Sequence, residues 1–216
     1  MQSDGYGAYD GAAVRLALTH VGCFAHLRRR FFEAIKALPR AQQKTATAAH
    51  EGVRRIDELY TVERDAKGLD PAERQRLRAE HAVPRLESLH RWADGLVRHT
   101  LPSGKLGDAL NYLLKQWPKL VRYVDDPHLA IDTNVAENAI RPFALGRRNW
   151  LFADTVKGAK ASAALYSLTA TARANGLEPY HYLCRLFAAL SKATTVADFE
   201  ALLPLREPTA IVADAA

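Results

Sequence analysis

The chain has only two cysteines among its 216 residues, Cys23 and Cys184. Two distant thiols cannot build the disulfide framework of a small secreted protein, so we expect a reducing compartment. The first residues also lack the basic and then apolar pattern of a secretory signal. No apolar run reaches the roughly 18 residues that cross a bilayer, and the sequence therefore predicts a cytoplasmic protein without a membrane segment.

Acidic residues are too few to balance the basic ones. The chain has 30 lysines and arginines against 24 aspartates and glutamates, a formal net charge of +6. This balance favours a polyanionic partner, although a soluble protein that is merely basic is the plainer alternative. Clustering supports a polyanion, since three consecutive arginines occupy 28–30 and a second basic group follows: Arg141, Arg147, Arg148, Lys157 and Lys160.

Internal repeats are absent, and runs of β-branched residues are scarce between about 43 and 122. Apolar residues recur with helical spacing over most of the chain. The predicted helices span 24–38, 43–67, 70–98 with a kink or split at Pro84, about 106–117, a segment that begins at Asn134, 157–174 and 178–191. Short extended segments are expected at 2–9, 14–18 and 149–153. The fold class predicted from these patterns is α/β and predominantly helical.

Two acidic residues are the candidates for chemistry, and each has a plain structural alternative. Asp4 precedes Gly5, a pair common in turns. Glu137 follows Asn134 at the spacing of a capping box and stands four residues before Arg141, which would also allow a surface ion pair. Brought together, the carboxylates of Asp4 and Glu137 could hold a divalent metal that acts on phosphodiesters. Asp132 is expected to be a turn aspartate.

Cys23 and His26 form a C-x-x-H pair, which is half of a tetrahedral zinc site. The remaining candidates for such a site, His181 and Cys184, lie on another predicted helix with an apolar face. We favour the alternative in which Cys23 packs as a small apolar residue and His26 makes a local hydrogen bond.

Several motifs in order resemble transposases of the insertion sequence 66 family. The matching segments are residues 2–6 (QSDGY), 22–31 (GCFAHLRRRF), 131–137 (IDTNVAE), 141–142 (RP), 146–152 (GRRNWLF), 166–168 (YSL) and 175–177 (NGL). Each motif alone is weak evidence. Their order from residue 2 to about residue 190 makes the resemblance specific.

The resemblance implies a ribonuclease H-like catalytic core of the DDE type, in which two aspartates and a glutamate hold two divalent ions, Mg²⁺ or Mn²⁺. Asp4 matches the second aspartate and Glu137 the glutamate, and Cys23 with His26 matches a structural C-x-x-H signature. Residues 1–150 would form a partial core with a helical insertion at about 40–125. Residues 151–216 would form a C-terminal element.

The first catalytic aspartate of this family lies upstream of the second and has no match in the sequence. The chain thus resembles the C-terminal portion of an enzyme that cuts and joins DNA strands during transposition, and we expect it to be inactive alone. Whether the chain itself is an enzyme is left open, and the alternative is a non-catalytic DNA-binding or assembly module.

The resemblance and the basic clusters together predict the partners of the chain. These would be DNA at the element ends and target, a polypeptide that supplies the N-terminal half, and further copies of the chain that associate through an exposed sheet edge. The expected phosphate contacts are Arg28, Arg29, Arg30, Arg141, Arg147 and Arg148.

Overall fold

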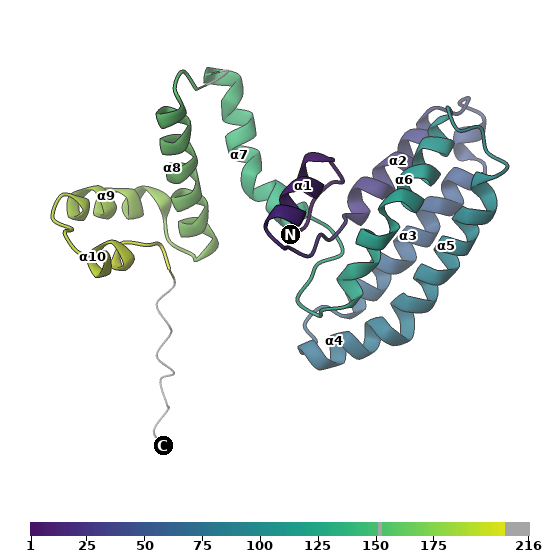
Figure 1. Ribbon diagram of the computed structural model, residues 1–216, viewed down its shortest axis with the longest axis horizontal. Coiled ribbons are helices and arrows are strands. Elements are labelled where there is room, and N and C mark those ends of the chain that lie inside the picture. The colour runs from purple at the N-terminus through teal and green to yellow at the C-terminus, as the bar shows by residue number, and fades with distance from the viewer. Residues whose placement is uncertain (151–152, 206–216) are drawn as a thin grey trace. The chain divides into compact units, whose positions relative to one another are not determined.

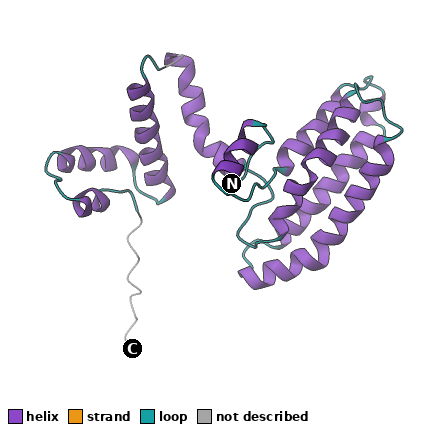
Figure 2. Cartoon of the chain, in the orientation of Figure 1, coloured by secondary structure: helices purple, strands orange, loops and turns teal. Residues whose placement is uncertain are grey.

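The computed structural model describes residues 1–150 and 153–205, and these residues are almost entirely helices joined by loops (Figure 2). They divide into two compact units, Met1–Ala136 and Glu137–Ala216. No helix in the described ranges combines the length and the apolar composition needed to cross a bilayer.

The first unit is built around a bundle of α2 (Phe24–Lys36), α3 (Ala48–Asp65), α5 (Val83–Val97) and α6 (Lys105–Leu120) (Figure 1). α2 and α5 each pack against both α3 and α6. Apolar residues at helical spacing supply one buried stripe per helix. The fully buried side chains of this core include Phe24, Leu27, Phe31, Ile56, Leu59, Leu89, Leu110, Leu113 and Leu120.

Shorter elements connect and cover the bundle. They are α1 (Ala8–Arg15), a 3₁₀ turn at Gln42–Lys44, α4 (Pro71–Leu77), a π-helical turn at Arg78–Ala82 and a 3₁₀ turn at Val121–Val124. The start of α4 follows its sequence signal, since the side chain of Asp70 accepts a hydrogen bond from the backbone N–H of Glu73 at 2.9 Å. Pro71, which has no N–H to leave unpaired, takes the first helical position.

α2 and α3 approach closely at Gly52. A Cβ atom added to this glycine would lie 2.5 Å from the ring of Phe31, whose side chain is fully buried. The absence of a side chain at Gly52 therefore makes room for the aromatic ring between the two helices.

The predicted break at Pro84 takes the form of the π turn, which joins α4 to α5. Its wider winding is marked by a hydrogen bond from the N–H of Val83 to the carbonyl of Arg78, five residues earlier. Pro84 follows directly and lacks the N–H that a regular helix would use. The chain thus passes the proline by widening one turn instead of ending the helix.

Arg78, on the π turn, is 1% exposed and joins distant parts of the first unit. Its guanidinium forms two hydrogen bonds with the carboxylate of Glu63, at 2.9 and 2.7 Å. It also donates to the carbonyls of Tyr123, Asp126 and Leu129, at 2.7 to 3.0 Å. The loop after α6 is therefore held to α3 through one buried side chain.

The second unit contains most of α7 (Asn134–Trp150), with α8 (Val156–Ala174), α9 (Pro179–Leu190) and α10 (Val196–Ala201). Phe143 on α7 meets Tyr166 on α8 edge to face, with ring centroids 5.1 Å apart. Among the described residues of this unit, the buried apolar cluster is small and consists of Ala172, Tyr182 and Leu186.

The prediction of a predominantly helical fold is confirmed, but the extended segment predicted at 14–18 is wrong. Val14 and Arg15 are the last residues of α1. The chain then turns at Ala17, whose φ is +49°. The alternating apolar side chains of this segment, Val14, Leu16 and Leu18, are exposed, so their alternation does not reflect a buried sheet face.

Two further boundaries differ from the sequence prediction. Residues 149–150 end α7 instead of starting an extended segment, while 151–152 lie outside the described residues. Within the described ranges, the sole β-type pairing is an isolated parallel bridge between Gln2 and Val21.

Candidate functional site

Asp4 lies on a tight turn beside the start of α2. The bridge between Gln2 and Val21 fixes the backbone before it, through a hydrogen bond from the N–H of Ser3 to the carbonyl of Val21 at 3.1 Å. The carboxylate Oδ1 of Asp4 accepts a hydrogen bond from the N–H of Tyr6 at 3.0 Å. The side chain is exposed, so a carboxylate oxygen of Asp4 is available to a ligand.

Tyr112, on α6, holds this turn from the bundle side. Its hydroxyl donates a hydrogen bond to the carbonyl of Asp4 at 2.7 Å. Burial raises the pKa of Tyr112 to about 12, so the hydroxyl keeps its proton near neutral pH. Gly5 has a φ of +84°, and a Cβ atom there would lie 2.9 Å from the Tyr112 oxygen. Both the backbone angle and the close approach therefore require glycine.

A chain of polar contacts, buried at Ser3 and His20, supports the same turn from its other side. The Oγ of Ser3 lies 2.7 Å from Nε2 of His20, whose Nδ1 is 2.9 Å from Oδ1 of Asp10, without the alignment of a hydrogen bond. Lys119 forms an ion pair with the same Asp10 oxygen at 2.5 Å. Ser3 and His20 are nearly inaccessible, so this chain of contacts positions the backbone next to Asp4 and does not offer a nucleophile.

A groove of about 460 Å³ opens at Asp4. Its walls come from the turn, from α2 and from α6, and include His26, Arg29, Arg30 and Tyr112. The guanidinium of Arg30 lies over the ring of Tyr112, 4.2 Å from its centroid. An exposed carboxylate and two exposed arginines therefore border one cavity.

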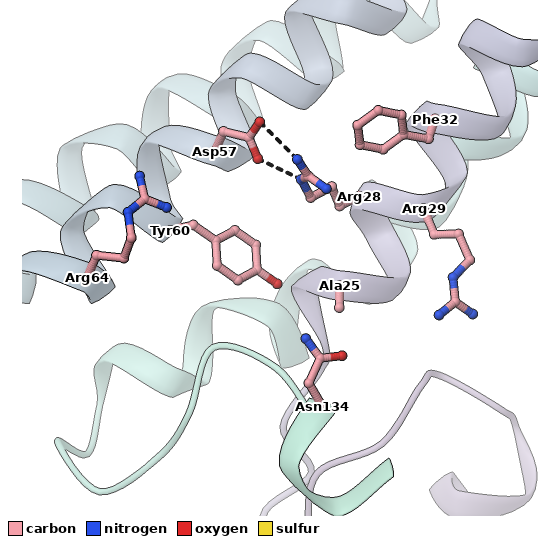
Figure 3. A pocket seen from close by; sticks show the side chains of 8 residues that line it. All are labelled: Ala25, Arg28, Arg29, Phe32, Asp57, Tyr60, Arg64 and Asn134. Carbon is pink, nitrogen blue, oxygen red and sulfur yellow. Dashed lines mark hydrogen bonds and ion pairs between the residues drawn. The ribbon is translucent and has the colours of Figure 1, made fainter. Parts of the chain in front are cut away.

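The three consecutive arginines differ in their surroundings. Arg28 donates two hydrogen bonds to Asp57 on α3, from Nε at 2.6 Å and from Nη2 at 3.1 Å (Figure 3). This ion pair raises the pKa of Arg28 and compensates its charge. Arg29 and Arg30 are exposed, and no ion pair involving either is found among the described residues. They are the two members of the run that keep an uncompensated charge.

Cys23 is fully buried immediately before α2. Its sulfur accepts hydrogen bonds from the backbone N–H of Thr133 at 3.4 Å and from the hydroxyl of Thr133 at 3.3 Å. The N–H of Phe24 donates to the carbonyl of Ile131 at 3.1 Å. These contacts join the segment before α7 to the start of α2. His26, one turn further on, lines the Asp4 groove.

Asp132 has both carboxylate oxygens engaged. Oδ2 accepts from the hydroxyl of Tyr60 at 2.8 Å and from the side-chain amide of Asn134 at 2.8 Å. Oδ1 accepts from the backbone N–H of Asn134 at 3.0 Å. Burial and the neighbouring carboxylate raise the pKa of Tyr60, which therefore remains a donor. Asp132 thus serves as a structural residue at the start of α7.

The remaining predicted site residues lie on α7 in the second unit. Glu137 is in the first turn of this helix, and Arg141 and Arg147 are exposed along it. The side chain of Arg148 is outside the described part of the chain. Asp4 and Glu137 belong to different units, so their convergence stays a prediction.

The sequence interpretation missed the residues that hold Asp4 in place: Ser3, His20 and Tyr112. No local signal marks them, because the contact from Tyr112 to Asp4 spans 108 positions. Only the side-by-side packing of α2 and α6 brings the tyrosine to the turn.

Comparison with known proteins places the chain in a family. The family described as "Transposase IS66 family" matches residues 1–161, and the one described as "IS66 C-terminal element" matches residues 167–205. No solved structure matches the chain at a significant level.

Curated relatives come from Sinorhizobium fredii (strain NBRC 101917 / NGR234), and all three are described as uncharacterized proteins. y4hP is 31% identical over 214 residues, y4qI is 30% identical over 211 and y4jD is 30% identical over 215. Each alignment covers 94% of this chain but only 38–40% of the relative, so the chain spans well under half the length of these proteins. The family matches extend over most of the sequence, and the chain therefore belongs to the IS66 transposase family.

Proposed function

We propose that this chain contributes two metal-binding carboxylates, Asp4 and Glu137, to a DDE transposase that cuts and joins DNA strands. Membership of the IS66 family supports a transposase-related role. The observation that carries the proposal is the setting of Asp4, whose exposed carboxylate shares a groove with Arg29 and Arg30. Phosphodiester chemistry needs both a ligand for metal ions and cations that hold phosphates.

The donor atoms fit the ions that such enzymes use. Mg²⁺ and Mn²⁺ prefer carboxylate oxygens, and Asp4 offers one that has no hydrogen bond among the described residues. Bound ions would supply activation of the attacking hydroxyl or water and stabilisation of the leaving oxygen. Glu137 is the second proposed ligand, and a ribonuclease H-like arrangement of the two acids belongs to the same proposal.

The surrounding residues have separate roles in this proposal. Tyr112 and Gly5 orient the Asp4 turn, while Arg29 and Arg30 bind DNA phosphates beside it. Arg141, Arg147 and Arg148 are proposed as further phosphate contacts from the second unit. Cys23 keeps a structural role, and His26 faces the groove.

The larger organisation is proposed on the same basis. Residues 1–150 would form the catalytic portion, with a helical insertion at about 40–125, and residues 151–216 the C-terminal element. The remaining catalytic aspartate would come from another polypeptide segment. DNA at the element ends and target would be the substrate, in the cytoplasm, and copies of the chain would assemble on it.

DNA binding tests the phosphate contacts. We expect the double variant Arg29→Ala with Arg30→Ala to weaken binding to every duplex. The slope of log K against log salt should flatten by the amount expected for the loss of about two phosphate contacts. The matched control is Arg91→Ala with Arg98→Ala, which removes the same charge from two exposed positions, one on α5 and one directly after it. Equal losses in both double variants would show that only net charge matters and would contradict the assigned groove.

Metal-dependent chemistry tests the carboxylates. Two of the three acidic residues of a DDE site, Asp4 and Glu137, have a match in this sequence. We therefore expect no cleavage of DNA by this chain alone with Mg²⁺ or Mn²⁺. We do expect Mn²⁺ to raise the Tm of the wild type, and Asp4→Asn and Glu137→Gln each to reduce this shift. A shift that survives in both variants would leave a non-catalytic DNA-binding or assembly module as the better description. Turnover that disappears in Glu137→Gln would show that the chain holds a complete site.

A further inference from the structure

A second pocket lies beside the Asp4 groove, on the face formed by α2, α3 and the start of α7. Its volume is about 510 Å³, within the range of small-molecule sites. Arg28, Arg29, Phe32, Asp57, Arg64 and Asn134 are among its lining residues (Figure 3). Arg29 also lines the Asp4 groove, so the two cavities share a wall.

The charge of this pocket suits a phosphate. Asp57 compensates Arg28, as described above. Arg64 donates to the hydroxyl of Thr61 at 2.7 Å, a neutral partner that leaves its charge uncompensated. Arg29 and Arg64 therefore supply the two free positive charges of the pocket, one from α2 and one from α3.

Its aromatic part suits a nucleobase. The guanidinium of Arg28 lies over the ring of Phe32, 4.6 Å from the centroid, and Asp57 holds it there with two hydrogen bonds (Figure 3). Bases stack on aromatic rings and on flat guanidinium groups in sites for unpaired nucleic acid. The ion pair thus keeps a stacking surface in place before any ligand arrives.

Asn134 adds a polar group that can contact the edge of a base. Its Nδ2 donates to Asp132, while its side-chain oxygen has no hydrogen bond among the described residues. That oxygen can accept a hydrogen bond from the exocyclic amine of a base such as adenine. One cavity therefore contains groups that can contact the phosphate, the ring face and the ring edge of a nucleotide.

We propose that this pocket binds one unpaired nucleotide of the DNA strand whose phosphates lie at Arg29 and Arg30. The inference rests on the proposed function, because it takes the DNA to pass the Asp4 groove. A base inside a duplex is stacked on its neighbours and cannot enter such a pocket, so the ligand is a strand end or a nucleotide turned out of the helix.

The test compares two fluorescent probes, a short blunt duplex and the same duplex extended by a few unpaired adenines at one 3′ end. Stacking of one base predicts roughly tenfold tighter binding of the extended probe by the wild type. Phe32→Leu and Arg64→Gln should reduce this ratio toward one while blunt-duplex affinity changes little. Phe32→Trp, which restores an aromatic face, should keep the ratio.

Arg30→Gln is the matched control, because Arg30 lines the Asp4 groove but not the pocket. It should weaken both probes equally and leave the ratio unchanged. A wild-type ratio near one, or a ratio that survives in both Phe32→Leu and Arg64→Gln, would overturn the pocket while leaving the DNA-binding proposal intact. Absence of binding to either probe would overturn both. Binding of free deoxyadenosine monophosphate without any preference for the overhang would assign the pocket to free nucleotides and also overturn this proposal.

Discussion

At the scale of single residues, His20 lies among charged and polar groups inside the first unit. It is 5% exposed, with Ser3 at one ring nitrogen and Asp10 near the other. Burial and the positive charge of Lys119 lower the pKa of His20, and they outweigh the opposite effect of Asp10. The folded protein therefore holds this imidazole in its neutral form.

Stability should fall as the pH is lowered through about 6.5, the ordinary pKa of an unfolded histidine. Because the pKa of His20 is lower in the folded state, the unfolded chain binds the proton first and gains stability. His20→Gln should flatten the rise of unfolding free energy between roughly pH 5 and 7, measured by urea denaturation. His99→Gln, at an exposed position, should keep the wild-type slope. An unchanged slope in His20→Gln would contradict the assignment.

The candidate site was only partly predictable from sequence, for a reason that is visible at Asp4. The Asp-Gly pair predicts a turn from local chemistry, and Gly5 does turn with a positive φ. The roles of Arg28, Arg29 and Arg30 depend on how α3 packs against α2, which the sequence does not reveal. Consecutive residues point about 100° apart on a helix, so only Arg28 reaches Asp57 on α3.

At the scale of elements, sequence patterns succeeded where an apolar stripe is buried. The stripe predicted for 24–38 contains Phe24, Leu27 and Phe31, which form the buried face of α2. Sequence patterns failed in α1, because apolar residues there are exposed and their spacing carries no information on burial. α10 was not predicted, although Thr195 and Asp198 form a capping box at its start.

Gly52→Ala tests the contact between α2 and α3. The added methyl group would overlap the Phe31 ring, and overpacking of this kind costs about 1–3 kcal/mol. The better helix propensity of alanine returns at most about 1 kcal/mol. We therefore expect a lower free energy of unfolding. Gly95→Ala is the control, because a Cβ atom there meets nothing within 4 Å on α5, and it should stabilise the protein.

Arg78→Met tests the connection between the π turn and the loop after α6. The substitution leaves the carboxylate of Glu63 and three carbonyls without their donor, and we expect a loss of about 3–5 kcal/mol. Arg76→Met, at an exposed position on α4, should change stability by less than about 0.5 kcal/mol. Similar losses in the two variants, measured by urea unfolding, would show that the buried network adds little.

At the scale of the whole molecule, the two units differ in how much apolar surface they bury. The core of the first unit extends through four packed helices. Among the described residues of the second unit, the buried cluster joins only α8 and α9. Since buried apolar area is the main source of stability, the second unit should open more easily.

Hydrogen exchange measured by mass spectrometry checks this difference. We expect peptides from α8 and α9 to exchange much faster than peptides from α3 and α5 under native conditions, because local opening of the smaller core costs less free energy. Addition of duplex DNA should leave α5 unchanged, which serves as the internal reference. Equal protection of α8 and α3 would contradict the expectation.

The π turn at Arg78–Ala82 also affects how the length of this chain can vary. Such a turn holds one residue more than an α-helix places between the same two hydrogen-bonded ends. Deleting one exposed residue from it, Ala79 or Glu80, would return the hydrogen bonds to regular α-helical spacing without rotating α5. Leu86, Leu89 and Ala93 would therefore still face the core. A one-residue deletion inside the regular part of α5 would instead rotate everything beyond it by about 100°, so a relative that is one residue shorter is easier to accept at the π turn than within α5.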